Sequence, residues 1–458
     1  MSKLLLMRHG KSVGNENNII QGVSDFALTL SGKRDVERLV SENISKFDDY
    51  ERIISSDLKR AVQTADILKE KVNKKVEYDP LVREVSAGIL DGVRKKDASE
   101  KYPYYYDIWN SRGDLDNIPL AETGDELQSR VLMFLEQYMD NDKNDIIVSH
   151  AAFLRSLYNT LMFQKRTNKL NLSHDNIYEI KNPWANLNVK KHDIAKNSVV
   201  HEISTYEKKY IMKKTKKEQI EILKREKDLL DFLNKYIITP KIISYSSRND
   251  YNLKILEYSE GRNINDNSLS KEAIQNTLIE VNKLENALKK YPNAEDFELL
   301  SINNDFLSTL DEINNLEIKK IGLDAYSNEH FINGIKNDSV QLVHDDLHRD
   351  NILYKKNKPI LLDFEGLKNT ASSYQLASHL AVNYILYDDN ISLDYLVNLY
   401  PESSDLDYIR SLVIYRLLKG YAFFENRYDK FHQNDDYSFV EKYKKTLKRM
   451  GENNWKQL

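Results

Sequence analysis

The chain contains no cysteine, and this absence removes several kinds of chemistry from consideration. A protein without cysteine forms no disulfide, offers no thiolate nucleophile and has no cysteine-ligated metal site. Its 458 residues are enough for two or three domains, each with a proper core. With 41% hydrophobic and 30% charged residues, the composition is that of an ordinary soluble globular protein.

Long apolar segments and an excess of charge of one sign are also missing. The N-terminal apolar run, Leu4 to Met7, is too short for a signal peptide or a membrane span, so we expect a cytoplasmic protein with no membrane partner. The 67 basic and 71 acidic side chains nearly cancel. Because no net positive field would attract a polyanion, we expect no nucleic acid partner, which argues against an enzyme that repairs nucleic acid ends.

Neither a repeat nor a low-complexity tract divides the chain, so its organisation follows from local patterns. Three short apolar segments, at residues 4–7, 53–56 and 145–150, run directly into polar residues, and the last two also lead into helical patterns. Such strand–loop–helix units predict an α/β sheet with mostly parallel strands. Polar side chains at the carboxyl ends of these strands are where ligands bind.

A second half with a different pattern follows. Around residues 181–197 scattered Asn, Lys and Pro residues predict a linker. Beyond it we expect paired strands at residues 199–203 and 209–213, a charged helix at 220–233 and a further strand at 253–258. The rest should be mostly helical, interrupted by a polar loop at 344–351 and a last strand at 359–364. Strands first and helices later is the order of a two-lobed, kinase-like α+β fold.

The strand ends of the first half supply the parts needed for phosphoryl transfer through histidine. That chemistry needs an imidazole held in one tautomer, cations around the phosphate oxygens and an acid for the leaving oxygen. Arg8-His9-Gly10 follows the first strand, and Arg60 opens the helix after the second. Glu84 lies in the sequence between that helix and the third strand, which ends in His150. Each alone could be an ordinary structural residue, but together and in this order they predict a phosphohistidine site.

The segments that carry these residues resemble the motifs of the histidine phosphatase (phosphoglycerate mutase-like) superfamily, nearly continuously from residue 1 to about 180. The similar segments are Arg8–Asn15, Gln21-Gly22, Ser55–Ala61, Arg83-Glu84, Glu122-Thr123 and Ser149-His150. The resemblance implies a three-layer α/β/α fold and a phosphatase that needs no cofactor. The short distance between Glu84 and His150 favours hydrolysis over mutase action.

The same resemblance implies a role for each matching residue. His9 would take the phosphoryl group, and Arg8, Arg60 and His150 would bind its oxygens. Glu84 would protonate the leaving oxygen and then activate water. The phosphate or substrate site would be lined by Asn15, Gln21 and Gly22. The aromatic segment 102–109 is either a cap that selects the substrate or a buried helix face.

In the second half, the loop His344–Asn351 gathers imidazole and hard oxygen ligands, and the strand after it ends in Asp363. Transfer from a nucleoside triphosphate needs one or two Mg²⁺ ions and a carboxylate near the acceptor hydroxyl, and a polar loop that closes onto an acidic strand end supplies such groups. A zinc site that uses His344 and His348 is the rival interpretation, although such histidine pairs usually lie on a helix with a third ligand.

This loop and its strand resemble the catalytic region of the aminoglycoside phosphotransferase/choline kinase superfamily. The resemblance implies that Asp346 is the catalytic carboxylate, that Asn351 and Asp363 bind Mg²⁺ and that ATP is the phosphate donor. It also implies nucleotide-binding residues, which are Lys213, Glu226, Glu257 and Tyr258. Asp345 stands in place of a usual Gly and Arg349-Asp350 in place of a common Pro-Gly, and no Gly-rich phosphate loop is visible near Ser198.

The sequence therefore predicts a phosphatase domain over residues 1–183, a linker over 184–196 and a kinase domain over 197–458, with lobes at about 197–260 and 261–458. Its partners would be ATP, a small phosphoester and a small-molecule hydroxyl acceptor such as a sugar or an amino alcohol. The two activities could act in series on one metabolite or oppose each other on a regulatory phosphoester. A third alternative is a pseudokinase that binds a nucleotide and regulates the phosphatase.

Overall fold

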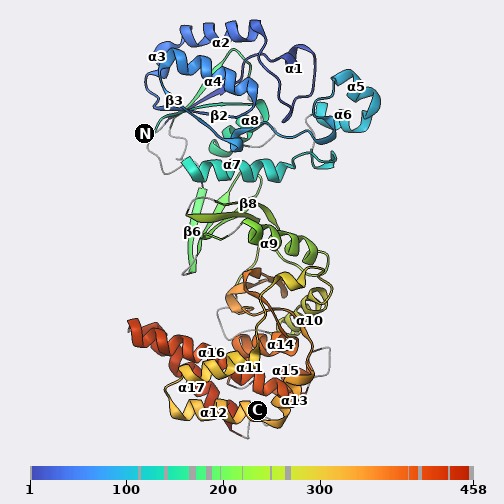
Figure 1. Ribbon diagram of the computed structural model, residues 1–458, viewed down its shortest axis with the longest axis vertical. Helices are drawn as coiled ribbons and strands as arrows, with labels where there is room; N and C mark the ends of the chain where they lie inside the picture. The colour runs from blue at the N-terminus through green and yellow to red at the C-terminus, as the bar shows by residue number, and fades with distance from the viewer. Residues whose placement is uncertain are drawn as a thin grey trace. The chain divides into compact units, whose positions relative to one another are not determined.

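The computed structural model describes residues 3–111, 115–138, 143–164, 172–181, 188–195, 198–218, 220–247, 250–263, 270–389, 391–400, 405–431 and 434–452. The chain forms two compact units (Figure 1): unit 1 comprises Met1–Ile220 and Ile242–Tyr258, and unit 2 comprises Glu221–Lys241 and Ser259–Leu458. Residues 184–187 and 196 of the predicted linker, and residue 197 at the predicted start of the second domain, lie outside the described residues.

Unit 1 begins with a five-stranded sheet in the order β3-β2-β4-β1-β5. Its strands are β1 (Lys3–Arg8), β2 (Arg52–Ser55), β3 (Lys75–Tyr78), β4 (Asp145–Ser149) and β5 (Ile177–Lys181). The helices around it are α1 (Val13–Glu16), α2 (Leu30–Glu42), α3 (Ile44–Phe47), α4 (Lys59–Val72), α5 (Lys95–Lys101), α6 (Pro103–Asn110), α7 (Gly124–Tyr138) and α8 (Ala151–Leu161). The first four strands are parallel, as predicted, and β5 runs antiparallel to β1.

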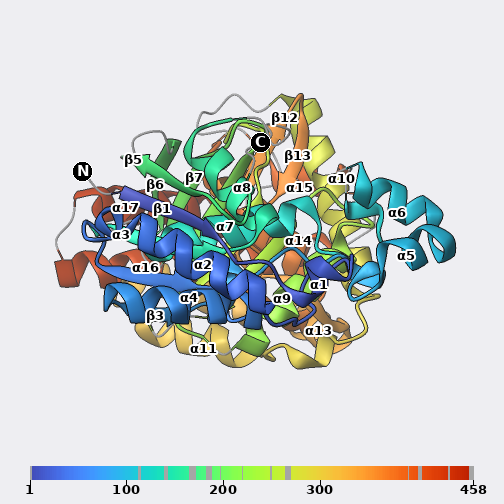
Figure 2. The ribbon, with the colours of Figure 1, turned by 90° about the horizontal axis from the view of Figure 1, so that it is seen from above.

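This sheet is the middle of three layers. Successive side chains of a strand point to opposite faces, and Leu4 and Leu6 of β1 join a core with α7 and α8. Leu5 and Met7 join a second core with α2 and α4. Figures 1 and 2 show α2 and α4 together on one side of the sheet. The predicted three-layer α/β/α fold is confirmed.

A second five-stranded sheet belongs to the same unit, in the order β6-β7-β8-β10-β9, with every neighbouring pair antiparallel. Its strands are β6 (Asn188–Ala195), β7 (Ser198–Ser204), β8 (Lys209–Lys216), β9 (Ile242–Ser247) and β10 (Tyr251–Glu257). The predicted strands of this region are confirmed. Part of the predicted linker, however, is strand β6. It is an edge strand that pairs only with β7, and its Lys-rich sequence carries little of the apolar alternation that predicts a strand.

Helix α7 lies between the two sheets and is buried on both sides. Val131, Leu132 and Phe134 form one continuous core with β1, β4 and α8 and with apolar side chains of the second sheet, namely Ile203, Tyr210, Met212, Leu253 and Ile255. A helix covered on one side only would show one apolar stripe, whereas α7 buries the whole run from Val131 to Leu135. The two sheets are therefore parts of one packed body.

Unit 2 contains a mainly helical body with two small antiparallel sheets, β11-β14 and β12-β13. Its strands are β11 (Val340–His344), β12 (Ile352–Lys355), β13 (Lys358–Leu361) and β14 (Leu367–Ala371). Its helices are α9 (Ile220–Leu233), α10 (Lys271–Leu288), α11 (Ile302–Glu312), α12 (Leu316–Tyr326), α13 (Glu329–Asn337), α14 (Ser373–Leu380), α15 (Leu393–Asn398), α16 (Leu406–Phe431) and α17 (Asn434–Gly451). This order confirms the predicted helix-rich second half.

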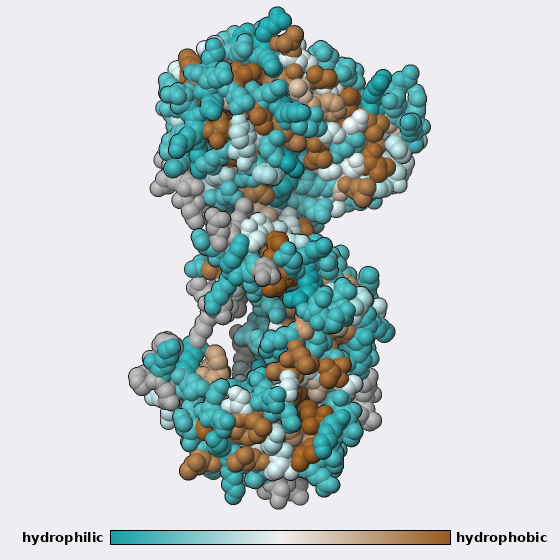
Figure 3. Space-filling model, viewed as in Figure 1, coloured by the Kyte–Doolittle hydropathy of each residue, from teal (hydrophilic) through white to brown (hydrophobic). Residues whose placement is uncertain are grey.

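Among the described residues, no helix combines the length and the apolar character that a membrane crossing requires. The face shown in Figure 3 is mostly hydrophilic, with apolar residues in small scattered groups. Such scattered groups are normal on the surface of a folded chain.

Replacing Leu253 with alanine should loosen α7 as well as β10, because both contribute to one core. Loss of this fully buried side chain should lower the free energy of unfolding of unit 1 by about 2–5 kcal/mol. Hydrogen exchange should then speed up for the α7 amides. The matched control is Leu278→Ala in α10 of unit 2, which is equally buried and should leave α7 exchange unchanged. Equal α7 protection in the Leu253 variant and the wild type would contradict the shared core.

Candidate active sites

The carboxyl ends of three neighbouring strands bring the predicted residues of the first half together. The order β2-β4-β1 puts Ser56, His150 and His9 side by side at one edge of the sheet. Two backbone bonds tie these ends to each other: the His9 amide donates to the Ser149 carbonyl at 3.0 Å and the Ser56 amide to the Val148 carbonyl at 3.0 Å. The rings of His9 and His150 have centroids 5.0 Å apart.

His9 is held in one tautomer. Its Nδ1 lies 2.8 Å from the carbonyl oxygen of Gly10, which can only accept, so Nδ1 carries the hydrogen and Nε2 keeps its lone pair. Burial and then the charges of His150, Arg60, Arg8 and His174 hold the pKa of His9 well below its usual value. His9 is therefore held as a neutral imidazole whose Nε2 keeps its lone pair.

Arg60 connects His150 to the loop that carries Gly22. Its Nε donates to His150 Nδ1 at 3.2 Å, and its two terminal nitrogens donate to the carbonyls of Gly22 and Ser24 at 2.7 Å each. His150 Nε2 therefore bears the hydrogen and donates to Ser56 Oγ at 2.9 Å. Burial lowers the pKa of both Arg60 and His150, and for His150 the charge of Arg60 lowers it further.

The remaining predicted phosphate-site residues are Asn15, in α1, and Gln21 and Gly22, in the segment that follows α1. Ser12 Oγ is 2.8 Å from Asn15 Oδ1 and 2.5 Å from Gln21 Oε1, so the two amide side chains meet at one hydroxyl. Gly22 has a positive φ of 39°, and a Cβ there would lie 1.8 Å from Asp91 Oδ1. Only glycine fits this turn, because a side chain would collide with the half-buried Asp91 carboxylate.

Glu84 is held beside His150 by the start of α8. Its Oε1 accepts from the Ala152 amide at 3.1 Å and from the Val85 amide at 3.0 Å. Arg130 of α7 supports the same loop, since one terminal nitrogen donates to the carbonyls of both Leu81 and Arg83 at 2.7 Å. The predicted acid is thus fixed by α8 directly and by α7 through the backbone.

Arg8 and His174 add to the charges and rings around His9. Arg8 Nη1 donates to the Leu172 carbonyl at 3.0 Å, and His174 Nδ1 lies 2.6 Å from the His9 carbonyl oxygen, with ring centroids 5.3 Å apart. His174 was not among the predicted site residues. The only signal for it is topological: β5 runs antiparallel beside β1, so the residues just before β5 lie at the end of β1 where His9 is found.

The aromatic segment 102–109 falls largely in α6, and none of its residues is fully buried. The half-buried side chains of Tyr105, Tyr106, Ile108 and Trp109 rest on a small apolar cluster that includes Ile20, the neighbour of Gln21. One face of the segment is thus partly buried against this cluster, which agrees with a helix face that packs on the core. The role of the segment as a cap stays a prediction.

In unit 2, two hydrogen bonds, one from a side chain and one from the backbone, connect the residues predicted for a kinase site. Asn351 Nδ2 donates to the Asp346 carbonyl at 2.8 Å, and the Leu362 amide donates to the Asn351 carbonyl at 2.9 Å. Asp363, next to Leu362, has a left-handed φ of 58°. The Asp346 side chain is 58% exposed. The structure thus brings Asp346, Asn351 and Asp363 to one corner of the unit.

This corner offers oxygen ligands and excludes the zinc alternative for His344. Because Asn351 uses its amide nitrogen toward Asp346, its amide oxygen and the Asp363 carboxylate form a hard donor set, which fits Mg²⁺. His344 Nδ1 accepts from the Asp346 amide at 3.3 Å and Nε2 donates to the Leu362 carbonyl at 3.3 Å. Both ring nitrogens of His344 are engaged with the backbone, and burial lowers its pKa.

Asp345 and Arg349, which differ from the usual residues of the similar catalytic loop, each contact other side chains or backbone of unit 2. Lys419 Nζ lies 4.0 Å from Asp345 Oδ2. Arg349 donates through Nε and Nη2 to the Asn383 carbonyl at 3.0 and 2.8 Å and lies 3.9 Å above the Tyr387 ring centroid. These contacts fasten the loop without the Pro-Gly pair. Two basic side chains also lie near the Asp346 carboxylate: His348 Nε2 at 3.7 Å and Arg416 Nη2 at 3.9 Å.

The predicted nucleotide-binding residues divide between the units. Lys213 of β8 lies opposite Lys254 of β10 in an antiparallel register. Its neighbour Met212 faces α7, so Lys213, the next residue along the strand, occupies the opposite face of the sheet. Glu257 and Tyr258 are also in unit 1, at the end of β10, whereas Glu226 of α9 is in unit 2. A Lys213–Glu226 pair stays a prediction.

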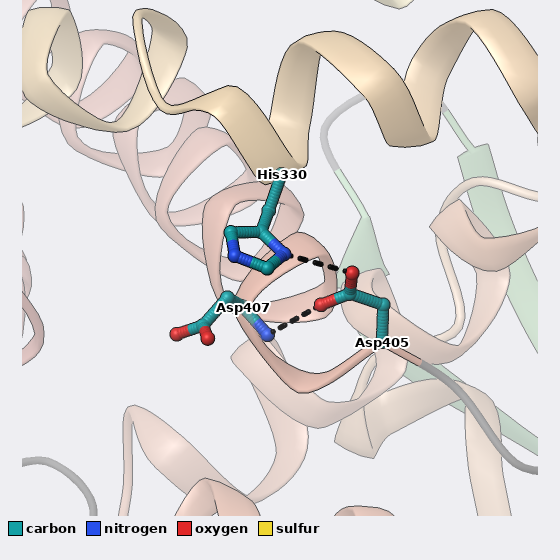
Figure 4. A group of neighbouring side chains, drawn as sticks. All are labelled: His330, Asp405 and Asp407. Carbon is teal, nitrogen blue, oxygen red and sulfur yellow. Dashed lines mark hydrogen bonds and ion pairs between the residues drawn. The ribbon is translucent and has the colours of Figure 1, made fainter.

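One further cluster in unit 2 has the donor atoms of a metal site, but helix capping accounts for it. Ligand atoms of His330, Asp405 and Asp407 lie within 4.8 Å of one another (Figure 4). Asp405 accepts from the Asp407 and Tyr408 amides at 3.0 and 3.1 Å at the start of α16, and its other oxygen is 2.9 Å from His330 Nδ1. That hydrogen bond raises the pKa of His330.

Comparison with known proteins finds a family match for each half, and the first match, supported by a relative 34% identical, shows that the chain belongs to the histidine phosphatase superfamily. Residues 4–180 match the histidine phosphatase superfamily (branch 1), and residues 195–402 match the phosphotransferase enzyme family named APH. "Phosphoglycerate mutase-like protein 4" of Arabidopsis thaliana is 34% identical over 34% of this chain and 70% of its own length. "Phosphoserine phosphatase 1" of Hydrogenobacter thermophilus is 29% identical over 35% of this chain and 77% of its own.

Among solved structures, "Amicoumacin kinase hAmiN in complex with AMP-PNP, Ca2+ and Ami" is similar over 57% of this chain and 87% of its own, with 14% identity and a TM-score of 0.45. The curated relatives named above cover only the first part of this chain.

Acid should destabilise unit 1 through its neutral histidines. Burial and the charge of Arg8 lower the pKa of His174 from 6.5 to about 4. Between these values the unfolded chain binds a proton that the folded chain does not, so the free energy of unfolding falls as pH falls. On acidification from about pH 7.5 to about pH 5, the free energy of unfolding of His174→Asn should fall by about 1–2 kcal/mol less than that of the wild type, measured by urea unfolding.

The control for this measurement has the opposite sign. The pKa of His330 is raised in the folded chain, so this residue stabilises below its unfolded pKa and loses that contribution as pH rises. On acidification, the free energy of unfolding of His330→Asn should therefore fall more than that of the wild type, whereas that of His174→Asn should fall less. The same pH slope in the His174 variant and the wild type would show that His174 is not kept neutral by the fold.

Proposed function

We propose that the chain, which belongs to the histidine phosphatase superfamily through residues 4–180 and matches the phosphotransferase enzyme family over residues 195–402, is a bifunctional enzyme of small metabolites. The first half hydrolyses a phosphomonoester through a phosphohistidine at His9. The second half transfers a phosphoryl group from ATP to a small-molecule hydroxyl, as found in a sugar or an amino alcohol, with Asp346 as its catalytic carboxylate.

The observation that supports the phosphatase assignment most strongly is the tautomer of His9. Since Gly10 takes the Nδ1 hydrogen, Nε2 can attack phosphorus without first losing a proton. As the new N–P bond forms, the P–O bond to the leaving oxygen breaks, and Glu84 gives that oxygen its proton. Arg8, Arg60 and His150 would bind the remaining phosphate oxygens.

The second step returns both residues to their starting states. Glu84 takes a proton from water, and the water oxygen forms a bond to phosphorus as the N–P bond breaks. Inorganic phosphate leaves, and His9 is again a neutral imidazole. Glu84 is suited to this exchange because its carboxylate is fixed beside His150 by the Ala152 amide at the start of α8.

The kinase assignment depends on the corner formed by Asp346, Asn351 and Asp363. Asp346 is exposed enough to receive an acceptor hydroxyl, and it would take that hydroxyl's proton as the oxygen attacks the γ-phosphorus and ADP leaves. Held by Asn351 and Asp363, Mg²⁺ would neutralise the phosphates of ATP. Lys213 would bind those phosphates, with Glu226 as its partner, and Glu257 and Tyr258 would border the adenine.

The two activities fit a serial arrangement in which the phosphatase removes one phosphate from a metabolite and the kinase adds one at another position. Two activities opposing each other on one hydroxyl without control would only hydrolyse ATP. Hydrolysis is proposed in preference to the phosphoglycerate mutase reaction, whose name several relatives carry, because the segment between Glu84 and His150 is short.

His9→Ala should abolish the phosphoenzyme. We expect a radiolabelled phosphomonoester, quenched within the first turnovers, to leave an acid-labile and base-stable label on the wild type and none on His9→Ala. His330→Ala, which alters an exposed histidine in unit 2, should keep the label. A panel that includes sugar phosphates, phosphoserine and both phosphoglycerates would name the substrate. Label that persists in His9→Ala would refute the assignment of the nucleophile.

Asp346→Ala should reduce acceptor-dependent ADP formation by about a hundredfold or more, since removal of a positioned general base typically costs 10²–10⁴-fold. The assay supplies Mg-ATP and a panel of sugars, amino alcohols and aminoglycosides. Asp311→Ala, an exposed carboxylate on α11, is the matched control and should leave the rate unchanged. If the wild type binds ATP but forms no ADP with any acceptor, the second half is a pseudokinase that senses nucleotide.

A further inference from the structure

The peptide group between His9 and Gly10 is held at both of its polar ends. Its carbonyl oxygen, that of His9, lies 2.6 Å from His174 Nδ1. Its amide, that of Gly10, donates to Thr64 Oγ1 at 3.0 Å. A peptide group is planar and rigid, so two bonds on opposite edges fix its orientation. The next carbonyl, that of Gly10, is the group that binds His9 Nδ1.

The direction of the His174 bond is set by chemistry. A carbonyl oxygen only accepts, so His174 Nδ1 carries the hydrogen and donates. Thr64 is equally constrained, because its hydroxyl accepts from Gly10 and donates to the Arg60 carbonyl at 2.7 Å. Neither holding group can turn away from the His9–Gly10 peptide without losing its own hydrogen bond.

Residues 172–174 form a support beside the nucleophile. They lead directly into β5, which is paired along its length with β1, so their position is tied to the strand that carries His9. The Leu172 carbonyl accepts from Arg8, and His174 packs its ring 5.3 Å from that of His9 at an angle of 55°. This segment thus contacts the backbone and the side chains of the Arg8-His9-Gly10 motif.

We propose that His174 is a positioning residue of the phosphatase reaction. By donating to the His9 carbonyl it fixes the peptide that leads to Gly10, and the Gly10 carbonyl in turn holds His9 with Nε2 toward the substrate. The proposal rests on the proposed function of His9 as nucleophile, and it adds a residue that acts through His9 without touching the phosphate.

Three substitutions separate the two nitrogens of His174. His174→Asn places an amide N–H where Nδ1 was and removes the group at Nε2. His174→Gln places its amide near Nε2 and removes the donor to His9. His174→Ala removes both. Thermal unfolding of each variant identifies any that fails to fold, and Asn and Gln are close enough in size and polarity to serve as controls for each other.

The first readout needs no substrate. In histidine-labelled protein, long-range ¹H–¹⁵N spectra report which nitrogen of His9 carries the hydrogen. We expect the Nδ1–H form alone in the wild type and in His174→Asn, and a mixture of tautomers in His174→Gln and His174→Ala. A pure Nδ1–H form in all four proteins would overturn the proposal, whether or not the protein is a phosphatase.

The second readout is turnover of p-nitrophenyl phosphate. For His174→Ala and His174→Gln, kcat should fall about tenfold to a hundredfold with KM little changed, because a misplaced nucleophile slows the chemical step more than binding. His174→Asn should restore kcat. Rescue by Gln but not by Asn would overturn the proposal and assign substrate contact through Nε2. Failure of the phosphohistidine assignment shows separately, as activity that survives His9→Ala.

Discussion

The burial of α7 on two sides is the constraint on which most of unit 1 depends. One side of this helix completes the core under the parallel sheet, and the other receives Tyr210, Met212, Leu253 and Ile255 from the antiparallel sheet. Burying that much apolar surface is the main source of stability available to either sheet. The polar residues of α7 follow the same division. Arg130 holds the loop of Glu84, while Glu136 accepts from Tyr251 at 2.9 Å and pairs with Lys214.

This packing explains why family boundaries and compact units differ along the chain. The two families meet between residues 180 and 195, whereas the units divide within the second half, with β6 to β10 on the side of the phosphatase fold. A sequence family is matched along consecutive residues of the chain. A compact unit, in contrast, is defined by which residues pack together, and the apolar face of the antiparallel sheet is buried against α7. Neither half is therefore a closed physical module, although each carries its own motifs.

The sequence was sufficient wherever function demands particular residues at strand ends. His9, Arg60 and His150 could be placed together because parallel strands bring their carboxyl ends to one edge of a sheet.

The sequence was not sufficient where residues that are neighbours in space are distant in sequence. The apolar run from Val131 to Leu135 fits a helix buried on both sides, but nothing in it names the second sheet as the cover. His174 was missed because its contact with His9 depends on the pairing of β5 with β1, and β6 was missed because an edge strand needs little apolar alternation.

The two proposed sites treat the same ionic group in opposite ways, and their charges show why. Around His9 the protein supplies the positive charge itself, through Arg8 and Arg60, and the same cations, together with burial, keep the histidine neutral and nucleophilic. On the proposed function, a phosphate dianion would meet fixed cations there and would need no metal to screen it. Around Asp346 the protein supplies carboxylates and an amide oxygen, which repel a polyphosphate unless a divalent cation lies between them. If both proposals hold, one chain would bind phosphate at two sites without exchanging their substrates, because only the second site would require its phosphate to arrive with a metal ion.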